Sequence, residues 1–235
     1  MPLVFGARFA HAAETTMSGA ELAERIRSAE PEENSEIHGT LITRHGKDVT
    51  RVPIVCRVTL KGATWETEYK TSSAAGINAE LLLIVHNTNG PNQYLFSQAA
   101  TPDGQLPKPS AMPATSTDAP FAGSAFSPDD LGLEFLHWPQ QKRLPNQTRL
   151  TRACYVLESS NPGGRGIVRV TSFIDQESFG LLIAKAYDAN GQIVKEFSLQ
   201  GGSFKKVNGR WRLERMNIRD YKTDLRTELK FDINE

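Results

Sequence analysis

The sequence predicts a mainly β fold, a strongly curved antiparallel sheet of about 11 strands with an N-terminal helix and a short lid helix. Hydrophobic and polar residues alternate over much of the chain, as in strands that bury one face. Short turn signals such as Asn208-Gly209 separate these runs. Because so many twisted strands cannot lie flat in one sheet, we expect the sheet to curl toward a barrel or to split into two layers.

The composition allows a sizeable core and excludes some partners. The 235 residues are 39% hydrophobic, and 27 basic residues balance 27 acidic ones. A chain without net charge has no long-range field that would attract nucleic acid or an anionic membrane surface, so we expect no nucleic-acid partner. The longest apolar run, 81–85, is too short to cross a membrane as a helix.

Residues 1–16 are interpreted as either the remnant of a signal peptide or a disordered segment. Ala10-His11-Ala12-Ala13 fits a small-x-small cleavage site. Arg8 interrupts the short apolar stretch, however, and a basic segment before it is missing. Residues 17–235 are predicted to form a single domain.

The N-terminal helix is predicted to begin after Ser18. Ser18 and Glu21 have the spacing of a capping box, in which both side chains accept hydrogen bonds from amides at the helix start. The pattern continues to about Ala29, and Pro31 ends it.

Strands are expected from Glu36 onward. Ile54 and Val58 fall on the apolar face of an alternating run. The runs 81–85 and 93–98 flank a dense turn signal and predict a hairpin.

A proline-rich loop over 99–125 and a lid helix over 127–138 follow. Ser127 can cap this helix, and Pro128 suits its first position. Leu131, Phe135 and Trp138 form an apolar stripe at helical spacing, with Phe126 placed to pack against its first turn. The stripe fits either core packing or a ligand-facing lid. We expect loop and helix together to be a movable cover.

The rest of the chain is predicted to be entirely β. The strand-like runs are 150–158, 166–175, 179–187, 192–199, 203–207, 211–220 and 223–233. The last run alternates most clearly, and Leu225, Leu229 and Phe231 share its apolar face.

The sequence contains no recognisable catalytic or metal-binding motif. Its five histidines lack metal-ligand spacing. Asp129 and Asp130 are adjacent, so helix capping explains them better than acid/base catalysis. Cys56 and Cys154 are expected to be two packed thiols, with a disulfide as the alternative. We therefore expect no catalytic residue, no metal, no cofactor and no enzymatic activity.

Three stretches resemble the bacterial outer-membrane lipoprotein-sorting proteins of LolA-like fold. They are Phe126 to Pro139, Ala153 to Asp175, and Trp211 to Leu229. The resemblance implies an unclosed β-barrel, lined by apolar side chains and covered by helices, that holds the acyl chains of lipoproteins in the periplasm.

The apolar face of the curved sheet is too wide for two short helices to fill, so a pocket is expected. The residues predicted to line the pocket or its lid are Phe126, Leu131, Phe135, Trp138, Ile54, Val58, Leu225, Leu229 and Phe231. Burial in such a pocket stabilises an acyl chain by about 0.8 kcal/mol per methylene without directional bonds.

The function expected from these features is that of a periplasmic carrier for the acyl chains of lipoproteins or for lipids. Its further partner would be an inner-membrane transporter, and the carrier would be a monomer. The alternative is a periplasmic regulatory interaction domain of the same fold that senses lipid or polypeptide.

Overall fold

The computed structural model describes residues 17–62, 64–87, 90–164, 166–199, 203–207 and 210–233, and the proposed signal remnant over 1–16 lies outside them. The elements in chain order are α1 (Gly19–Arg27), β1 (Ser35–His45), β2 (Asp48–Lys61), β3 (Thr64–Thr71), β4 (Glu80–His86), β5 (Gln93–Gln98), β6 (Ser110–Ala111), α2 (Pro128–Leu131), the 3-10 helix η1 (Glu134–His137), β7 (Gln140–Arg149), β8 (Arg152–Ser160), β9 (Arg169–Asp175), β10 (Leu181–Tyr187), β11 (Ile193–Ser198), β12 (Phe204–Val207), β13 (Arg210–Leu213), β14 (Arg215–Asp220) and β15 (Leu225–Phe231).

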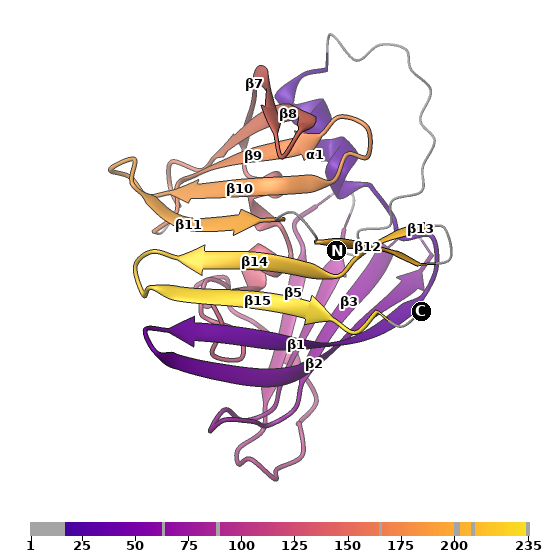
Figure 1. The fold of residues 1–235 in the computed structure, drawn as a ribbon, viewed down its shortest axis with the longest axis vertical. Coiled ribbons are helices and arrows are strands. Elements are labelled where there is room, and N and C mark those ends of the chain that lie inside the picture. Colours follow the sequence, from indigo (N-terminus) through magenta and orange to yellow (C-terminus); the bar gives the residue numbers. More distant parts are fainter. Residues whose placement is uncertain are drawn as a thin grey trace.

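One antiparallel sheet dominates the fold. Its 13 strands follow the order β6-β5-β4-β3-β2-β1-β15-β14-β11-β10-β9-β8-β7, and the two ends do not join. Figure 1 shows β10, β11, β14, β15, β1 and β2 side by side, with β3 and β5 behind them. The predicted fold class, a mainly β protein with an unclosed curved sheet, is confirmed. The strand number exceeds the expected 11, because the large sheet has 13 strands and β12 and β13 pair separately.

Three differences explain the extra strands. The two-residue strand β6 pairs with β5 and lies within the loop predicted over 99–125. The edge strand β7 was not predicted, because its residues, QQKRLPNQTR, are polar and mostly exposed and so show no apolar alternation. The run expected as one strand over 211–220 is divided at Glu214. Its first part pairs with β12, whereas its second part joins the large sheet between β11 and β15.

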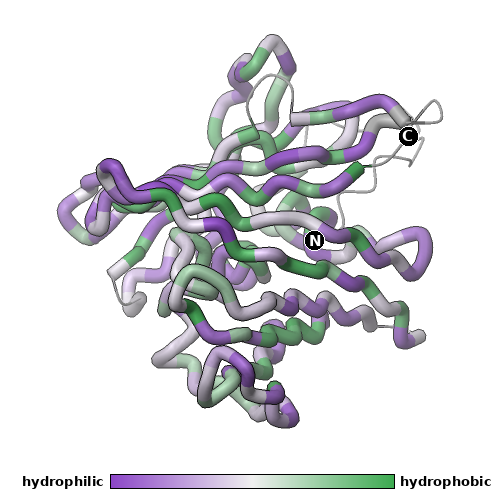
Figure 2. Tube along the Cα trace, turned by 60° about the horizontal axis from the view of Figure 1, so that its bottom comes forward, coloured by the Kyte–Doolittle hydropathy of each residue, from purple (hydrophilic) through white to green (hydrophobic). Residues whose placement is uncertain are grey.

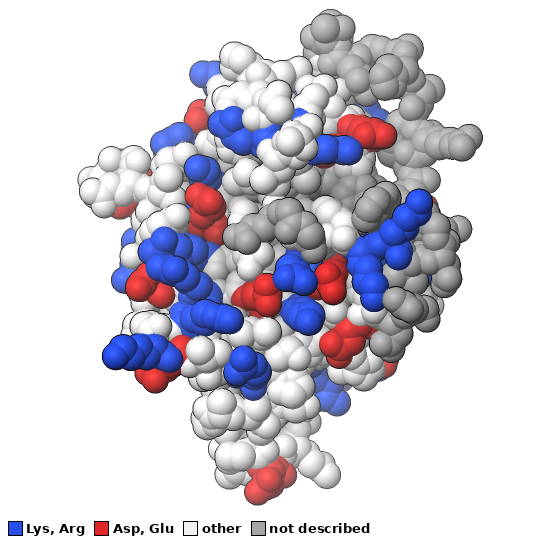
Figure 3. Space-filling model, in the orientation of Figure 1, with Lys and Arg blue, Asp and Glu red and all other residues white. Residues whose placement is uncertain are grey.

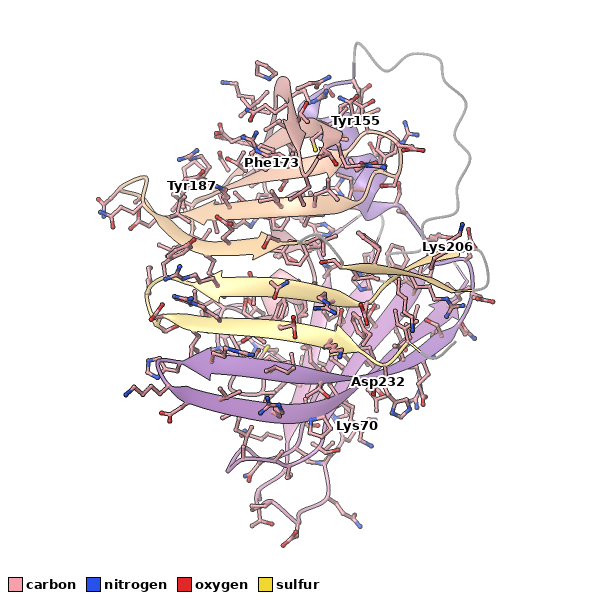
Figure 4. The ribbon with its side chains drawn as sticks, viewed as in Figure 1. Lys70, Tyr155, Phe173, Tyr187, Lys206 and Asp232 are labelled. Carbon is pink, nitrogen blue, oxygen red and sulfur yellow. The ribbon has the colours of Figure 1, made fainter. Side chains whose placement is uncertain are left out.

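Successive side chains of each strand point to opposite faces of the sheet. Figure 2 shows hydrophobic and hydrophilic residues following one another along the strands. Tyr155 on β8 packs in a core cluster with α1 on the concave face. Phe173 on β9 belongs to a cluster on the opposite face, where Phe204 and Leu213 of the β12–β13 hairpin pack. Figure 4 labels Tyr155 and Phe173 in the upper part of the sheet. The sheet is therefore covered on both faces at this end.

Helix α1 covers one end of the concave face. The predicted capping box between Ser18 and Glu21 is present, and Leu22, Ala23 and Ile26 form the buried side of the helix. A Cβ atom at Gly19 would collide with the backbone carbonyl group of Gln141 on β7. The helix start therefore requires glycine, because only a residue without a side chain allows so close an approach.

Residues 121–136, here called the inner segment, cross the concave face. This segment was expected to belong to one movable cover over 99–137, but Phe121, Ala122 and Phe126 are at most 2% exposed. The stretch before it, 100–120, is mostly exposed. The cover is therefore divided into an outer loop and a buried part.

Buried side chains of the sheet hold the inner segment. The backbone N–H of Ala122 donates to Glu80 Oε2 on β4 at 2.7 Å, and that of Ala125 donates to Thr227 Oγ1 on β15 at 2.8 Å. Thr227 Oγ1 also lies 2.9 Å from Thr43 Oγ1 on β1. Since a buried amide without a partner is costly, these acceptors fix where the segment lies.

Substituting Thr227 and Thr43 separately tests this attachment. We expect Thr227→Val to lower the free energy of unfolding by about 1–3 kcal/mol, because it leaves the Ala125 amide buried without an acceptor. Thr43→Val is the control, since it removes only the hydroxyl pair and should cost about 0.5–1.5 kcal/mol. Urea unfolding measures both. Equal losses in the two variants would contradict the assigned role of Thr227.

Candidate functional site

A cavity of about 1000 Å³ lies between the inner segment and the concave face of the sheet. The sheet residues that line it come from β3, β5, β6, β9, β10, β11 and β14. Further lining residues come from the outer loop over 112–118, from the turn after β14, and from Asn161, Gly163, Gly164, Gly166 and Ile167. The volume is at the upper end of the range of about 300–1000 Å³ that is usual for ligand pockets.

One wall of the cavity is apolar. It is formed by the side chains Val170, Leu181, Ala184, Ala186, Val194, Phe197, Met216 and Ile218 of β9, β10, β11 and β14. Opposite them, Leu131, Phe135 and Trp138 line the cavity from the inner segment and the residues that follow it. Two apolar surfaces on different parts of the chain therefore face one space.

Local interactions fix the start of α2 in the inner segment. Ser127 and Asp130 form a capping box, as the Asp130 amide donates to Ser127 Oγ and the Ser127 amide donates to Asp130 Oδ2. Lys195 Nζ on β11 lies 2.7 Å from the same Asp130 Oδ2. The predicted cap at Ser127 and the position of Pro128 are confirmed. The cap and the ion pair together tie α2 to the strand that forms the opposite wall.

The expected continuous helix over 127–138 is interrupted at Gly132 and Leu133. A Cβ atom at Gly132 would overlap the hydroxyl group of Tyr94 on β5, so the chain needs glycine there. Leu133 adopts a left-handed conformation with φ 51° and ψ 43°, which is uncommon for a residue with a side chain. The interruption separates α2 from η1, and residues of both line the cavity.

One side of the cavity carries carboxyl groups. Tyr94 Oη donates to Glu134 Oε2 at 2.8 Å. Burial raises the pKa of Glu134 to about 7, against the opposing effect of this hydrogen bond. Burial likewise raises the pKa of Asp129 to about 6. Asp129 and Glu134 both line the cavity, so its polar side gains or loses charge near neutral pH.

The structure places most of the residues predicted for the site in two regions, with Val58 in neither. Phe126, Leu131, Phe135 and Trp138 line the cavity. Ile54, Leu229 and Phe231 are buried in the core cluster beneath the inner segment, Leu225 packs against that cluster, and Val58 is buried elsewhere on β2. Sequence reasoning missed the lining residues of β10, β11 and β14. The alternation of those strands indicates which residues share a face, but it does not show which part of that face borders a cavity.

The described residues contain no group of three or more His, Cys, Asp or Glu side chains placed to hold a metal ion. The two thiols are free and lie in separate regions. Burial raises the pKa of Cys56 to about 12 and also raises that of Cys154, which disfavours the nucleophilic thiolate. Among the helices that the structure describes, none has the length and apolar character needed to span a bilayer.

Glu134→Gln tests the electrostatics of the cavity. Because the pKa of Glu134 is raised from 4.5 to about 7 on folding, the folded protein holds this proton more tightly than the unfolded chain. Its contribution to the free energy of unfolding therefore falls as the pH rises through this window. Gln keeps an acceptor for Tyr94 but does not ionise. The free energy of unfolding of the variant, relative to that of the wild type, should therefore rise as the pH increases from 4.5 to 7.

Urea unfolding of both proteins across this pH range checks the prediction. Burial lowers the pKa of His86 to about 3 and that of His137 to about 4, which gives a contribution of opposite sign. Since both proteins retain these histidines, the difference between them isolates Glu134. A difference that does not change with pH would show that Glu134 ionises normally.

Comparison with solved structures places this architecture among known folds. A domain of Vibrio parahaemolyticus described as an outer membrane lipoprotein-sorting protein domain aligns with a TM-score of 0.72 and 17% identity, over 92% of this chain and 90% of that one. A DUF1329 family protein of Desulfovibrio piger aligns with a TM-score of 0.70 and 16% identity, over 91% and 90%. A LolA superfamily protein of Nitrosomonas europaea aligns with a TM-score of 0.60 and 14% identity, over 93% of each chain.

No curated protein sequence matches the chain. A family model whose description reads "-like: Uncharacterized protein" matches residues 71–234. The solved structures show that the chain has a LolA-like fold. Because the family model spans more than half of the chain, the chain belongs to the family that this model describes.

Proposed function

We propose that this protein is a non-enzymatic carrier that holds the acyl chains of lipoproteins or lipids in the cavity behind its inner segment. The observation that carries the proposal is the cavity of about 1000 Å³ between two apolar surfaces, one on the sheet and one on α2, η1 and Trp138. An acyl chain needs such a space and gains about 0.8 kcal/mol for each methylene that leaves water.

The polar side of the cavity fits the same ligand. The head of a lipid or the peptide part of a lipoprotein carries amides and hydroxyls that donate hydrogen bonds. The carboxyl groups of Asp129 and Glu134 and the hydroxyl of Tyr94 lie at the cavity and can accept them. We place the head at this side and the acyl chain along β10, β11 and β14.

The comparisons support a carrier role at the level of the fold. The Vibrio domain is described as lipoprotein-sorting, and its name refers to the outer membrane. From this likeness we propose that the present carrier works as a monomer in the periplasm and receives its cargo from an inner-membrane transporter. Fold alone leaves the cargo open, so the proposal depends on a binding experiment.

A fluorescent fatty acid provides the direct experiment. Protein purified without detergent should bind the probe, and a diacylated lipopeptide should displace it. The same peptide without its acyl chains is the control and should leave the probe bound. Absence of probe binding, or displacement by the unacylated peptide, would contradict the proposal.

Filling the cavity should abolish binding. Ala186 on β10 is buried and lines the cavity, so Ala186→Trp places a large side chain in the space that we assign to the acyl chain. We expect binding of the fluorescent fatty acid to weaken at least about tenfold, which corresponds to about 1.4 kcal/mol, or about two lost methylene contacts. Titration of the probe measures the effect.

Lys185→Trp is the matched control, because Lys185 directly precedes Ala186 on the same strand and its side chain lies on the opposite face of the sheet, where the ammonium is 3.5 Å from Glu196. Its probe affinity should equal that of the wild type. If the two variants bind the probe equally well, the acyl chain does not occupy this part of the cavity.

The fluorescence of Trp138 should report binding. Trp138 lines the cavity, whereas Trp65 is buried and stacks on His86 with ring centroids 4.9 Å apart. A non-fluorescent fatty acid should shift the emission of the wild type to shorter wavelength, because it displaces water from the indole of Trp138. Trp138→Phe should lose this shift and Trp65→Phe should keep it. The opposite result would place the ligand elsewhere.

A further inference from the structure

Three arginines lie directly opposite one another on neighbouring strands. In the register of the sheet, Arg44 on β1 pairs with Arg226 on β15, which pairs with Arg219 on β14. Like charges at directly opposite positions destabilise a sheet. These arginines face away from the cavity, since the adjacent residues Thr43 and Thr227 are buried beneath the inner segment.

Acidic residues compensate this row only in part. Asp224 Oδ1 lies 3.1 Å from Arg219 and 3.7 Å from Arg226. Arg44 and Arg51 are exposed and have no ion pair with any residue that the structure describes. Figure 3 shows lysines and arginines gathered over the corresponding ends of β14, β15, β1 and β2.

The two hairpins that carry the row have a local excess of positive charge. Residues 44–51 and 219–226 contain six Lys or Arg and three Asp, whereas the whole chain has no net charge. Although the chain as a whole has no net charge, these two hairpins therefore create a local positive electrostatic field.

Exposed apolar side chains lie at the same end of the sheet. The described residues include five exposed large hydrophobic side chains, and three of them are here. Val49 follows the β1–β2 turn and lies opposite Arg44, Tyr221 is in the β14–β15 turn, and Ile193 begins β11. Together with the arginines they form what we call the basic rim.

The basic rim adjoins the edge of the cavity. Lys222, in the same turn as Tyr221, lines the cavity. The Tyr221 amide donates to the Val194 carbonyl at 2.8 Å, which joins this turn to β11. Gly166 and Ile167 also line the cavity, and the amide of the following residue, Val168, donates to the Tyr187 carbonyl at the end of β10 at 2.9 Å.

We propose that the basic rim docks the protein onto the surface of a bilayer that contains anionic lipids. Guanidinium groups bind phosphate through paired hydrogen bonds, and a row of three matches a dense array of headgroups better than a single anion. Exposed tyrosine and aliphatic side chains favour the interface of a bilayer. The role of this docking, which is to bring the edge of the cavity to the membrane, rests on the proposed carrier function. The binding to the bilayer itself does not.

Vesicle flotation tests the proposal. The full chain should float with vesicles of phosphatidylcholine and phosphatidylglycerol in equal parts and not with phosphatidylcholine alone, and added salt should release it. Arg226→Glu should weaken this binding about tenfold, because each basic residue at an anionic surface contributes a comparable factor. The variant should remain folded, since its new carboxylate lies between Arg44 and Arg219.

Lys230→Glu is the matched control. Lys230 is exposed on the same strand, four residues from Arg226, and its substitution changes the net charge equally. It should retain wild-type flotation. Failure of the wild type to bind anionic vesicles, equal binding to neutral vesicles, or equal loss in both variants would overturn the docking proposal.

Fatty-acid binding without vesicles separates this result from the carrier function. Arg226 faces away from the cavity, so Arg226→Glu should bind the fluorescent fatty acid like the wild type. Normal probe binding without flotation would reject only the docking. Flotation without probe binding would reject only the carrier function.

Discussion

The structure depends on the hydrogen bonds through which the sheet holds the inner segment. A curved sheet of 13 strands leaves a wide concave face, and α1 covers only one end of it. The inner segment covers the middle without being a strand, so its buried amides need acceptors from side chains. Glu80 and Thr227 supply them at Ala122 and Ala125. Without these acceptors the segment would cover the core and one wall of the cavity with unpaired buried amides, which is costly.

The cavity follows from this attachment. Glu80 and Thr227 hold the first part of the inner segment against β4 and β15, and the ion pair between Asp130 and Lys195 holds α2 to β11. Beyond these points the segment and the strands β10, β11 and β14 line the cavity from opposite sides. The tightly packed region gives the fold stability, and the open region gives space for a ligand. A carrier needs both, because a filled interior holds no cargo and an uncovered one would expose apolar surface to water.

Local patterns made much of the fold predictable. The alternation of β15 and the caps at Ser18 and Ser127 depend on nearby residues, and the structure confirms them. The edge strand β7 has no such pattern. The interruption of the lid helix depends on contact between Gly132 and Tyr94, which lie 38 positions apart in sequence. Likewise Thr227, which anchors the inner segment, looks in sequence like any residue of an alternating strand. Strand alternation alone also does not show which apolar residues pack in the core and which line the cavity.

Photo-crosslinking tests most directly whether an acyl chain occupies the cavity. A fatty acid with a diazirine near its chain end would be irradiated with the protein, and the modified peptides would be identified by mass spectrometry. The account predicts labels on residues 181–186, 194–197 or 131–138, which line the cavity from its two sides. Labels confined to the β12–β13 hairpin on the other face of the sheet, or labelling that excess unlabelled fatty acid does not suppress, would contradict it.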